Sequence, residues 1–342
     1  MTATRPALLV GSVNLASAEE VFATAGDILG DSLRFVPDGE TGERIQWFTW
    51  QKNVMERAPF LRKATRDGET ESRRLARYGV NGDLSGARFD KLGYAEAAIA
   101  SYEIFTALRD QGKIPAGVRF QVSLPTPLAP MMSMIEADDF QKVEPLYEDA
   151  MRREIERMCE VIPVDDLAIQ WDVASELSLL EGLSPLEGKC PFSDPESEMA
   201  GRLAKFIDWV PEGAAAGIHL CYGDYEHKHF KEPKDTGLMA DFANAVFERV
   251  SRRVDWLHLP VPKDRDDDAY FAPLEKLELP AGTQLYLGLV HYTDGLEGGR
   301  RRMKTAGRHV SGFGVSTECG LGRRPAETIP DVMKLMATLA SS

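Results

Sequence analysis

Cysteine and histidine are scarce in this chain, and long apolar runs are absent. The 342 residues contain 4 cysteines and 6 histidines. Four cysteines without close pairing are too few for the disulfide scaffold of a secreted protein this long, so in a reducing compartment they are thiols or metal ligands. No stretch approaches the roughly 18 apolar residues of a membrane span, and the run Ala7–Val10 is too short for a secretion signal. We therefore expect a cytoplasmic protein with no membrane partner.

Positive charge is also in short supply. Lysine and arginine total 40 against 54 aspartates and glutamates, which gives a formal net charge of −14. Binding to a nucleic-acid backbone requires a basic surface, so the composition argues against nucleic acid as a partner. Hydrophobic residues at 43% and charged residues at 27% are typical of a soluble globular enzyme, whose expected partners are small molecules. None of these features indicates an oligomeric state.

Short β-branched runs alternate with longer amphipathic stretches along the chain. Apolar residues at positions i, i+3, i+4 and i+7 of the longer stretches favour helices, whereas the short runs favour strands. The predicted strands are Ala7–Ser12, Leu33–Pro37, Val118–Leu124, Leu167–Asp172, Ala216–Tyr222, Val254–Pro260, Gln284–Val290 and Ser311–Thr317. The predicted helices are Ala18–Leu29, Tyr94–Gln111, Asp139–Cys159, Glu198–Val210, Leu238–Arg252, Leu296–Ala306 and Ala326–Leu339.

Eight strands separated by helices predict an α/β protein with a (β/α)8 TIM barrel. We expect one domain over residues 1–342, with an insertion at about residues 51–92 between the second and third strands. A doubly wound open sheet is the alternative, but it usually has fewer strands per domain. A barrel places its chemistry at the carboxyl ends of the strands, where the loops that lead into the helices gather.

Candidate metal ligands occur at two of these strand ends. His219 and Cys221 are two residues apart on the fifth strand, so they point to the same side, and Cys319 follows the eighth strand. Three such ligands with one open position are typical of catalytic zinc. On a strand, however, a His-x-Cys pair is more often two core residues than a metal site, and that alternative stays open at this point. His227 and His229 form a second pair in a charged loop, which we interpret as solvated.

The two candidate zinc segments resemble those of the cobalamin-independent methionine synthase family. They are Ile218-His219-Leu220-Cys221-Tyr222-Gly223-Asp224 and Ser316-Thr317-Glu318-Cys319-Gly320-Leu321-Gly322-Arg323-Arg324. The resemblance implies that zinc activates a thiol acceptor as a zinc thiolate, which attacks an alkyl, in particular a methyl, group. It covers nearly the whole chain and corresponds to the catalytic barrel of that family.

Three further segments are similar to the same family in the same order. Val10-Gly11-Ser12 is similar to its first-strand Gly-Ser, which implies that Gly11 and Ser12 contact the amino-acid substrate. The segment Asp38–Arg44 resembles its His-Gly-Glu-x-x-Arg motif, in which the Glu that holds the amino group corresponds to Glu40. The segment Ile169–Asp172 resembles another strand end and implies a second amino-group partner, Asp172.

The chain departs from the family pattern at three places. The family has a zinc-ligating Glu at the end of strand six, where this chain has Pro260. His258 lies two residues earlier on the same face of the strand, and it is either a substitute fourth ligand or a buried structural residue. The family's strand seven ends with an Asp and, two residues later, a His that is its general acid. The corresponding positions here are His291 and Thr293, so His291 is the predicted proton donor, shifted by one inward position. Only the segments 124–127 and 131–132 correspond to the folate-binding part, so the co-substrate is methyltetrahydrofolate or another methyl donor.

The resulting hypothesis is a zinc-dependent methyltransferase with a small thiol as acceptor and a small alkyl donor. Two alternatives stay open. A metal-free lyase related to uroporphyrinogen decarboxylase would share the barrel, but it would require a basic site for substrate carboxylates. A non-catalytic barrel that binds thiols or zinc would keep the ligands without the reaction.

Overall fold

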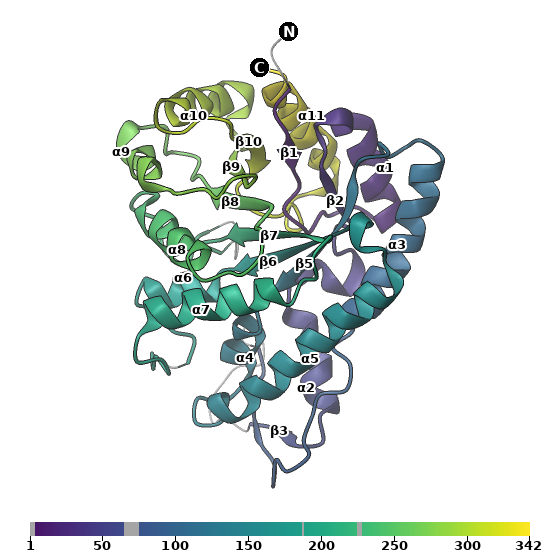
Figure 1. Ribbon diagram of the computed structural model, residues 1–342, viewed down its shortest axis with the longest axis vertical. Helices are drawn as coiled ribbons and strands as arrows, with labels where there is room; N and C mark the ends of the chain where they lie inside the picture. Colours follow the sequence, from purple (N-terminus) through teal and green to yellow (C-terminus); the bar gives the residue numbers. More distant parts are fainter. Residues whose placement is uncertain (1–3, 65–74, 187, 224–227) are drawn as a thin grey trace.

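Eight parallel strands form the centre of the protein (Figure 1). The computed structural model describes residues 4–64, 75–186, 188–223 and 228–342. The sheet order is β1-β10-β9-β8-β7-β6-β5-β2, and a bridge between Ala7 and Leu33 brings its two edges together. The strands are β1 Ala7–Leu8, β2 Phe35–Pro37, β5 Arg119–Pro125, β6 Leu167–Val173, β7 Ala215–Leu220, β8 Trp256–Pro260, β9 Gln284–Val290 and β10 Gly314–Thr317. The nearly closed barrel confirms the predicted TIM-barrel fold.

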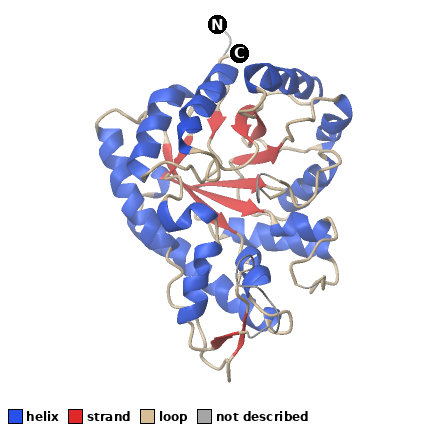
Figure 2. Cartoon of the chain, turned by 180° about the vertical axis from the view of Figure 1, so that it is seen from behind, coloured by secondary structure: helices blue, strands red, loops and turns tan. Residues whose placement is uncertain are grey.

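Helices surround the strands on the outside (Figure 2). The longer ones are α1 Ala18–Leu29, α3 Tyr94–Asp110, α5 Phe140–Val161, α7 Pro195–Asp208, α8 Gly237–Phe247, α10 Gly295–His309 and α11 Ile329–Ala340. The shorter ones are α2 Lys52–Arg57, α4 Leu128–Met134, α6 Ser175–Leu180 and α9 Asp268–Phe271. Among the described helices, none is both long and apolar enough to cross a membrane.

The predicted helix that ends at Arg252 is too long, because α8 ends at Phe247. The guanidinium of Arg252 donates hydrogen bonds to the carbonyls of Pro211 (2.8 Å) and Ala214 (2.6 Å), in the segment that leads into β7. Arg252 therefore stabilises the loop that precedes β7 and does not continue helix α8.

The segment predicted as an insertion contains α2 and a small antiparallel sheet. Strands β3 (Leu61–Lys63) and β4 (Tyr78–Val80) pair with each other at the end of the molecule away from α10 (Figure 1). Residues 65–74 of this segment lie outside the described residues. That the segment is an insertion, and that residues 1–342 form one domain, remain predictions.

The barrel interior has an apolar layer at the amino ends of the strands. This layer consists of Leu8, Ala168, Ala215, Trp256 and Tyr286, all buried. Trp256 stacks on Phe35 with ring centroids 4.3 Å apart, and it lies so close to Gly217 that a Cβ there would be 1.8 Å from its Cε2 atom. Polar side chains lie further along the strands, so the apolar layer closes one end of the barrel and leaves the carboxyl ends for chemistry.

Candidate functional site

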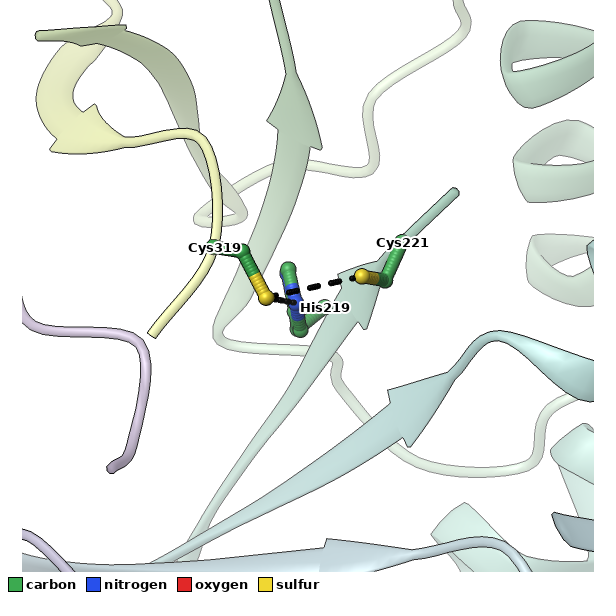
Figure 3. Close-up of side chains that lie close together, drawn as sticks. All are labelled: His219, Cys221 and Cys319. Atoms are coloured by element: carbon green, nitrogen blue, oxygen red, sulfur yellow. Dashed lines mark hydrogen bonds between the residues drawn. The ribbon is translucent and has the colours of Figure 1, made fainter. Parts of the chain in front are cut away.

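The three predicted zinc ligands lie together at the carboxyl ends of β7 and β10 (Figure 3). Their ligand atoms are all within 4.8 Å of one another. The Sγ atoms of Cys221 and Cys319 are 3.6 Å apart, and Cys319 Sγ is 3.9 Å from His219 Nε2. His219 and Cys221 reach the same point because they are two residues apart on one strand. The barrel thus assembles one nitrogen and two sulfur donors from segments about 100 residues apart in the sequence.

Backbone contacts hold the two cysteines in place. The Cys221 N–H donates to the carbonyl of Val173 (2.9 Å), and the Gly223 N–H donates to Cys221 Sγ (3.3 Å). Next to the second cysteine, β9 passes very close: a Cβ on Gly288 would lie 2.6 Å from Glu318 Cα. A glycine is therefore required at position 288 for the Cys319 segment to approach the barrel.

The donor set suits zinc, which takes imidazole nitrogen and thiolate sulfur in tetrahedral sites. Burial lowers the pKa of His219 well below its usual value, so the ring is neutral and has a lone pair available for a metal. The three side chains supply three ligands and would leave one coordination position for another molecule, the pattern of catalytic rather than structural zinc.

His258, the predicted candidate for a fourth ligand, does not belong to this group of three. Its Nδ1 atom lies 2.7 Å from Nδ1 of His219, and its Nε2 atom lies 3.0 Å from the carbonyl oxygen of Thr317. Both ring nitrogens are therefore occupied, and the ring stands beside His219 in the buried interior. Pro260, at the position of the expected Glu, ends β8 and offers no side-chain ligand.

A pair of buried carboxylic acids lies at the carboxyl ends of β2 and β6, which β5 separates in the sheet. Glu40 follows β2 and Asp172 lies near the end of β6, and each side chain is 8% exposed. Burial, followed by the charge of Asp172, raises the pKa of Glu40 well above its usual value. Burial also raises the pKa of Asp172 from 3.8 to about 7, although a hydrogen bond from Gln170 (2.8 Å) acts in the opposite direction. An ammonium group placed between the two acids would favour their charged forms, so the pair is suited to bind an amine.

The backbone at Glu40 is held in an unusual conformation. Glu40 has φ +50°, in the left-handed region that side chains other than glycine rarely adopt. Asp38 supports this turn: its carboxylate accepts hydrogen bonds from the Glu40 N–H (2.9 Å) and from Arg44 and Ser101 (both 2.6 Å). A left-handed residue at a strand end costs about 1–3 kcal/mol and is often found at functional sites. Arg44 is paired with Asp38, and its charge also lowers the pKa of Glu40, against the effect of burial.

The predicted substrate residues of the first strand adjoin both features. A Cβ on Gly11 would lie 3.7 Å from a carboxylate oxygen of Glu40, and a Cβ on Gly320 would lie 2.5 Å from Ser12 Oγ. The Ser12 carbonyl accepts a hydrogen bond from the Leu321 N–H (2.6 Å). Gly11 and Ser12 therefore lie between the acid pair and the segment that carries Cys319.

His291, the predicted proton donor, lies near Glu318, the residue before Cys319. Its Nε2 atom is 2.8 Å from the carbonyl oxygen of Val261, and its Nδ1 atom is 3.9 Å from a carboxylate oxygen of Glu318. Burial lowers the pKa of His291, and the charge of Glu318 opposes this. The ring is therefore connected to the cysteine segment through Glu318.

Two carboxylates of this region, Glu318 and Glu232, were not identified as site residues from the sequence. Glu318 lies 3.0 Å from His229 Nε2, and Glu232 lies 3.0 Å from its Nδ1. Although burial acts in the opposite direction, these two carboxylates raise the pKa of His229 to about 9. His229 is thus anchored to the strand ends rather than solvated as predicted, whereas His227 lies outside the described residues. In the sequence, the only feature that could have pointed to Glu318 was its position next to Cys319.

No family model and no curated protein matches the chain. Three solved structures are similar to it over nearly its whole length. A candidate vitamin-B12-independent methionine synthase from Listeria monocytogenes has a TM-score of 0.60 and 16% identity, covering 99% of this chain and 98% of the other. A B12-independent methionine synthase from Shewanella sp. W3-18-1, in complex with selenomethionine, has a TM-score of 0.58 and 15% identity (99% and 97%). A methyltransferase from Methanosarcina mazei has a TM-score of 0.55 and 12% identity (99% and 94%). At these identities the likeness shows a shared fold.

Proposed function

We propose that this protein is a zinc-dependent methyltransferase whose acceptor is a small amino-acid thiol. The observation that carries the proposal is the group His219, Cys221 and Cys319 at the carboxyl ends of the barrel strands. The similar structures support methyl transfer in particular, since two bear the name of a methionine synthase and one of a methyltransferase.

In this proposal His219, Cys221 and Cys319 hold the zinc ion. When bound, zinc would lower the pKa of a thiol at its open position and so supply a nucleophilic sulfur. Glu40 and Asp172 bind the ammonium group of the acceptor, whose positive charge would offset the burial that raises the pKa of both acids. Gly11 and Ser12, which lie between the acids and Cys319, position the rest of the amino acid.

The proposed reaction is an in-line displacement at the methyl carbon. The sulfur–carbon bond forms while the bond from carbon to the leaving atom breaks, and the electron pair departs with the leaving group. We assign to His291 the proton that this group takes up, because its ring lies beside the Glu318 carboxylate, whose charge opposes the lowering of the His291 pKa by burial. The donor is methyltetrahydrofolate or another methyl donor.

Zinc content and thioether formation test the proposal. Protein purified without added zinc is expected to contain about one zinc per chain, and Cys221→Ser and Cys319→Ser each lose it. Cys159→Ser, a cysteine on α5 away from the group, is the matched control and keeps it. Homocysteine and glutathione are then incubated with folate and non-folate methyl donors, and thioether is measured. A zinc content near zero, or zinc retained in both site variants, would overturn the proposal.

A further inference from the structure

The side of His219 that faces away from the cysteines is in contact with a second imidazole. His258 Nδ1 is 2.7 Å from His219 Nδ1, and the two ring centroids are 4.7 Å apart. Strands β7 and β8 align these residues directly opposite each other in the sheet. The two side chains are almost completely buried, at 2% and 0% exposure. A nitrogen–nitrogen distance this short requires a hydrogen bond, so one of the two nitrogens carries a proton and the other does not.

The carbonyl of Thr317 decides which nitrogen carries the proton. A carbonyl oxygen can only accept, so His258 Nε2, at 3.0 Å, must be the donor in that contact. Burial favours the neutral form of each ring, and a neutral imidazole has one N–H. His258 Nδ1 is then unprotonated and accepts from His219 Nδ1. It follows that His219 Nε2 is unprotonated, and this is the atom that lies 3.9 Å from Cys319 Sγ.

We propose that His258 is a positioning residue that fixes His219 in the tautomer whose unprotonated Nε2 faces the two cysteine sulfurs. The tautomer follows from contacts of the chain alone, whereas its importance for metal binding rests on the proposed zinc site. A metal-ligating histidine generally depends on such a partner for its other ring nitrogen, because the partner sets both tautomer and ring orientation.

Thr317 connects this pair of histidines to the third ligand. Its carbonyl accepts from His258, and its hydroxyl donates to the carbonyl of Cys319 (2.8 Å). The same residue therefore orients the histidine ligand through one oxygen and the Cys319 backbone through the other. The chain of contacts Thr317–His258–His219 holds two ligands from β7 and β10 in a fixed relation.

The tautomer is tested by nitrogen NMR of the full-length protein, before and after removal of zinc with a chelator. Two-bond nitrogen–proton correlations distinguish a protonated from an unprotonated ring nitrogen. We expect Nδ1 of His219 to be protonated in the zinc-free protein, and Nε2 of His258 as well. A His219 ring protonated at Nε2 in the zinc-free protein would overturn the inference, and this measurement needs no variant.

The consequence for the metal is tested by zinc affinity in competition with a chromophoric chelator. His258→Phe keeps a ring but removes both nitrogens, and we expect zinc affinity to fall about 10–100-fold. His258→Asn restores an acceptor near the Nδ1 position and is expected to recover part of the loss. His309→Phe, a histidine paired with Asp268 and Glu275, is the control and leaves affinity unchanged.

The two proposals fail in different ways. If the unaltered protein binds no zinc, the proposed function fails, while the NMR result still decides the tautomer. The unaltered protein and both variants, His258→Phe and His258→Asn, could instead bind zinc with the same affinity. In that case the positioning role of His258 is wrong and the zinc site stands.

Discussion

The surroundings of Asp172 and Glu40 disfavour the negatively charged form of both side chains. Burial raises the pKa of both side chains, and the charge of Asp172 raises the pKa of Glu40 further. Such an arrangement destabilises the folded protein in the absence of a cation, which is a common cost of a binding site prepared for a charged ligand. Stability as a function of pH should therefore reveal the acid pair.

We predict that Asp172→Asn stabilises the protein increasingly as pH rises from about 4 to about 7, with the full gain above pH 7. In the folded protein the pKa of Asp172 is about 7, whereas its ordinary value is 3.8. Between these values the unfolded chain has lost the proton and the folded protein has kept it, so the folded state loses stability as pH rises. Asparagine removes this loss and still accepts the hydrogen bond from Gln170. The gain at pH 8 is expected to be about 0.5–2 kcal/mol.

Urea unfolding at pH 4, 6 and 8 checks this prediction, with Asp138→Asn as a control on an exposed carboxylate. The difference in unfolding free energy between Asp172→Asn and the unaltered protein should increase from pH 4 to about pH 7 and then level off. A difference that is the same at pH 4 and pH 8 would contradict the raised pKa.

The grouping of His219, Cys221 and Cys319 could be predicted from the sequence, whereas the supporting contacts could not. The alternation of side chains on a strand places His219 and Cys221 on one side, and the resemblance to the methionine synthase segments added Cys319 to them. The role of His258 depends on the register between β7 and β8 and on the orientation of its ring, neither of which a single sequence fixes.

At the scale of elements, α3 begins without a capping side chain of its own. Its N-cap is Gly93, and the buried carboxylate of Glu154 on α5 accepts hydrogen bonds from the N–H groups of Leu92 (2.8 Å) and Ala95 (2.6 Å). A negative charge at this end also interacts favourably with the helix dipole. Helix α5 therefore fixes the start of α3 through one side chain.

Removal of this carboxylate is expected to destabilise the protein. Glu154→Ala leaves two backbone N–H groups without their acceptor and should lower the free energy of unfolding by about 1–3 kcal/mol. Glu156→Ala on the same helix removes a half-exposed carboxylate and should change it by less than about 0.5 kcal/mol. Equal effects of the two substitutions in chemical denaturation would show that the cap contributes nothing.

Periodicity predicted the elements of the barrel well and those of the segment after β2 poorly. The bounds of α1 agree with the prediction, and each of the eight predicted strands contains or overlaps a barrel strand. By contrast, β3 and β4 have three residues each, too few for an alternating pattern to appear. Their pairing depends on contacts across the segment and not on the local sequence.

At the scale of the whole molecule, one tryptophan fills the amino end of the barrel. Small residues on other barrel strands, such as Ala168, Ala215 and Gly217, leave the space that the Trp256 side chain fills. Because barrel interiors are packed as tightly as crystals, the volume of this layer is shared among strands. An added atom there affects the closure of the whole sheet.

Gly217→Ala is expected to strain this layer. The added Cβ would lie 1.8 Å from the indole of Trp256, so the ring or a strand must move, at a cost of about 1–3 kcal/mol. Gly201→Ala on α7 is the matched control, since nothing lies within 4 Å of its Cβ and alanine favours helices. Thermal unfolding should place the two variants on opposite sides of the unaltered protein. An unchanged midpoint for Gly217→Ala would contradict this account of the packing.

The positions of Cys221 and Cys319 also bear on the order in which the chain assembles. Strands β8 and β9 separate β7 from β10 in the sheet, so the two sulfurs meet only across the rim of a curved and nearly complete barrel. Contacts between residues so distant in sequence form late in folding, because their loops must close first. The 3.6 Å contact between the two Sγ atoms is therefore expected to form only in the final stage of folding. If the group binds zinc as proposed, partly assembled chains would hold the same cysteines too far apart to share the ion, and metal uptake would occur only in molecules whose barrel has closed.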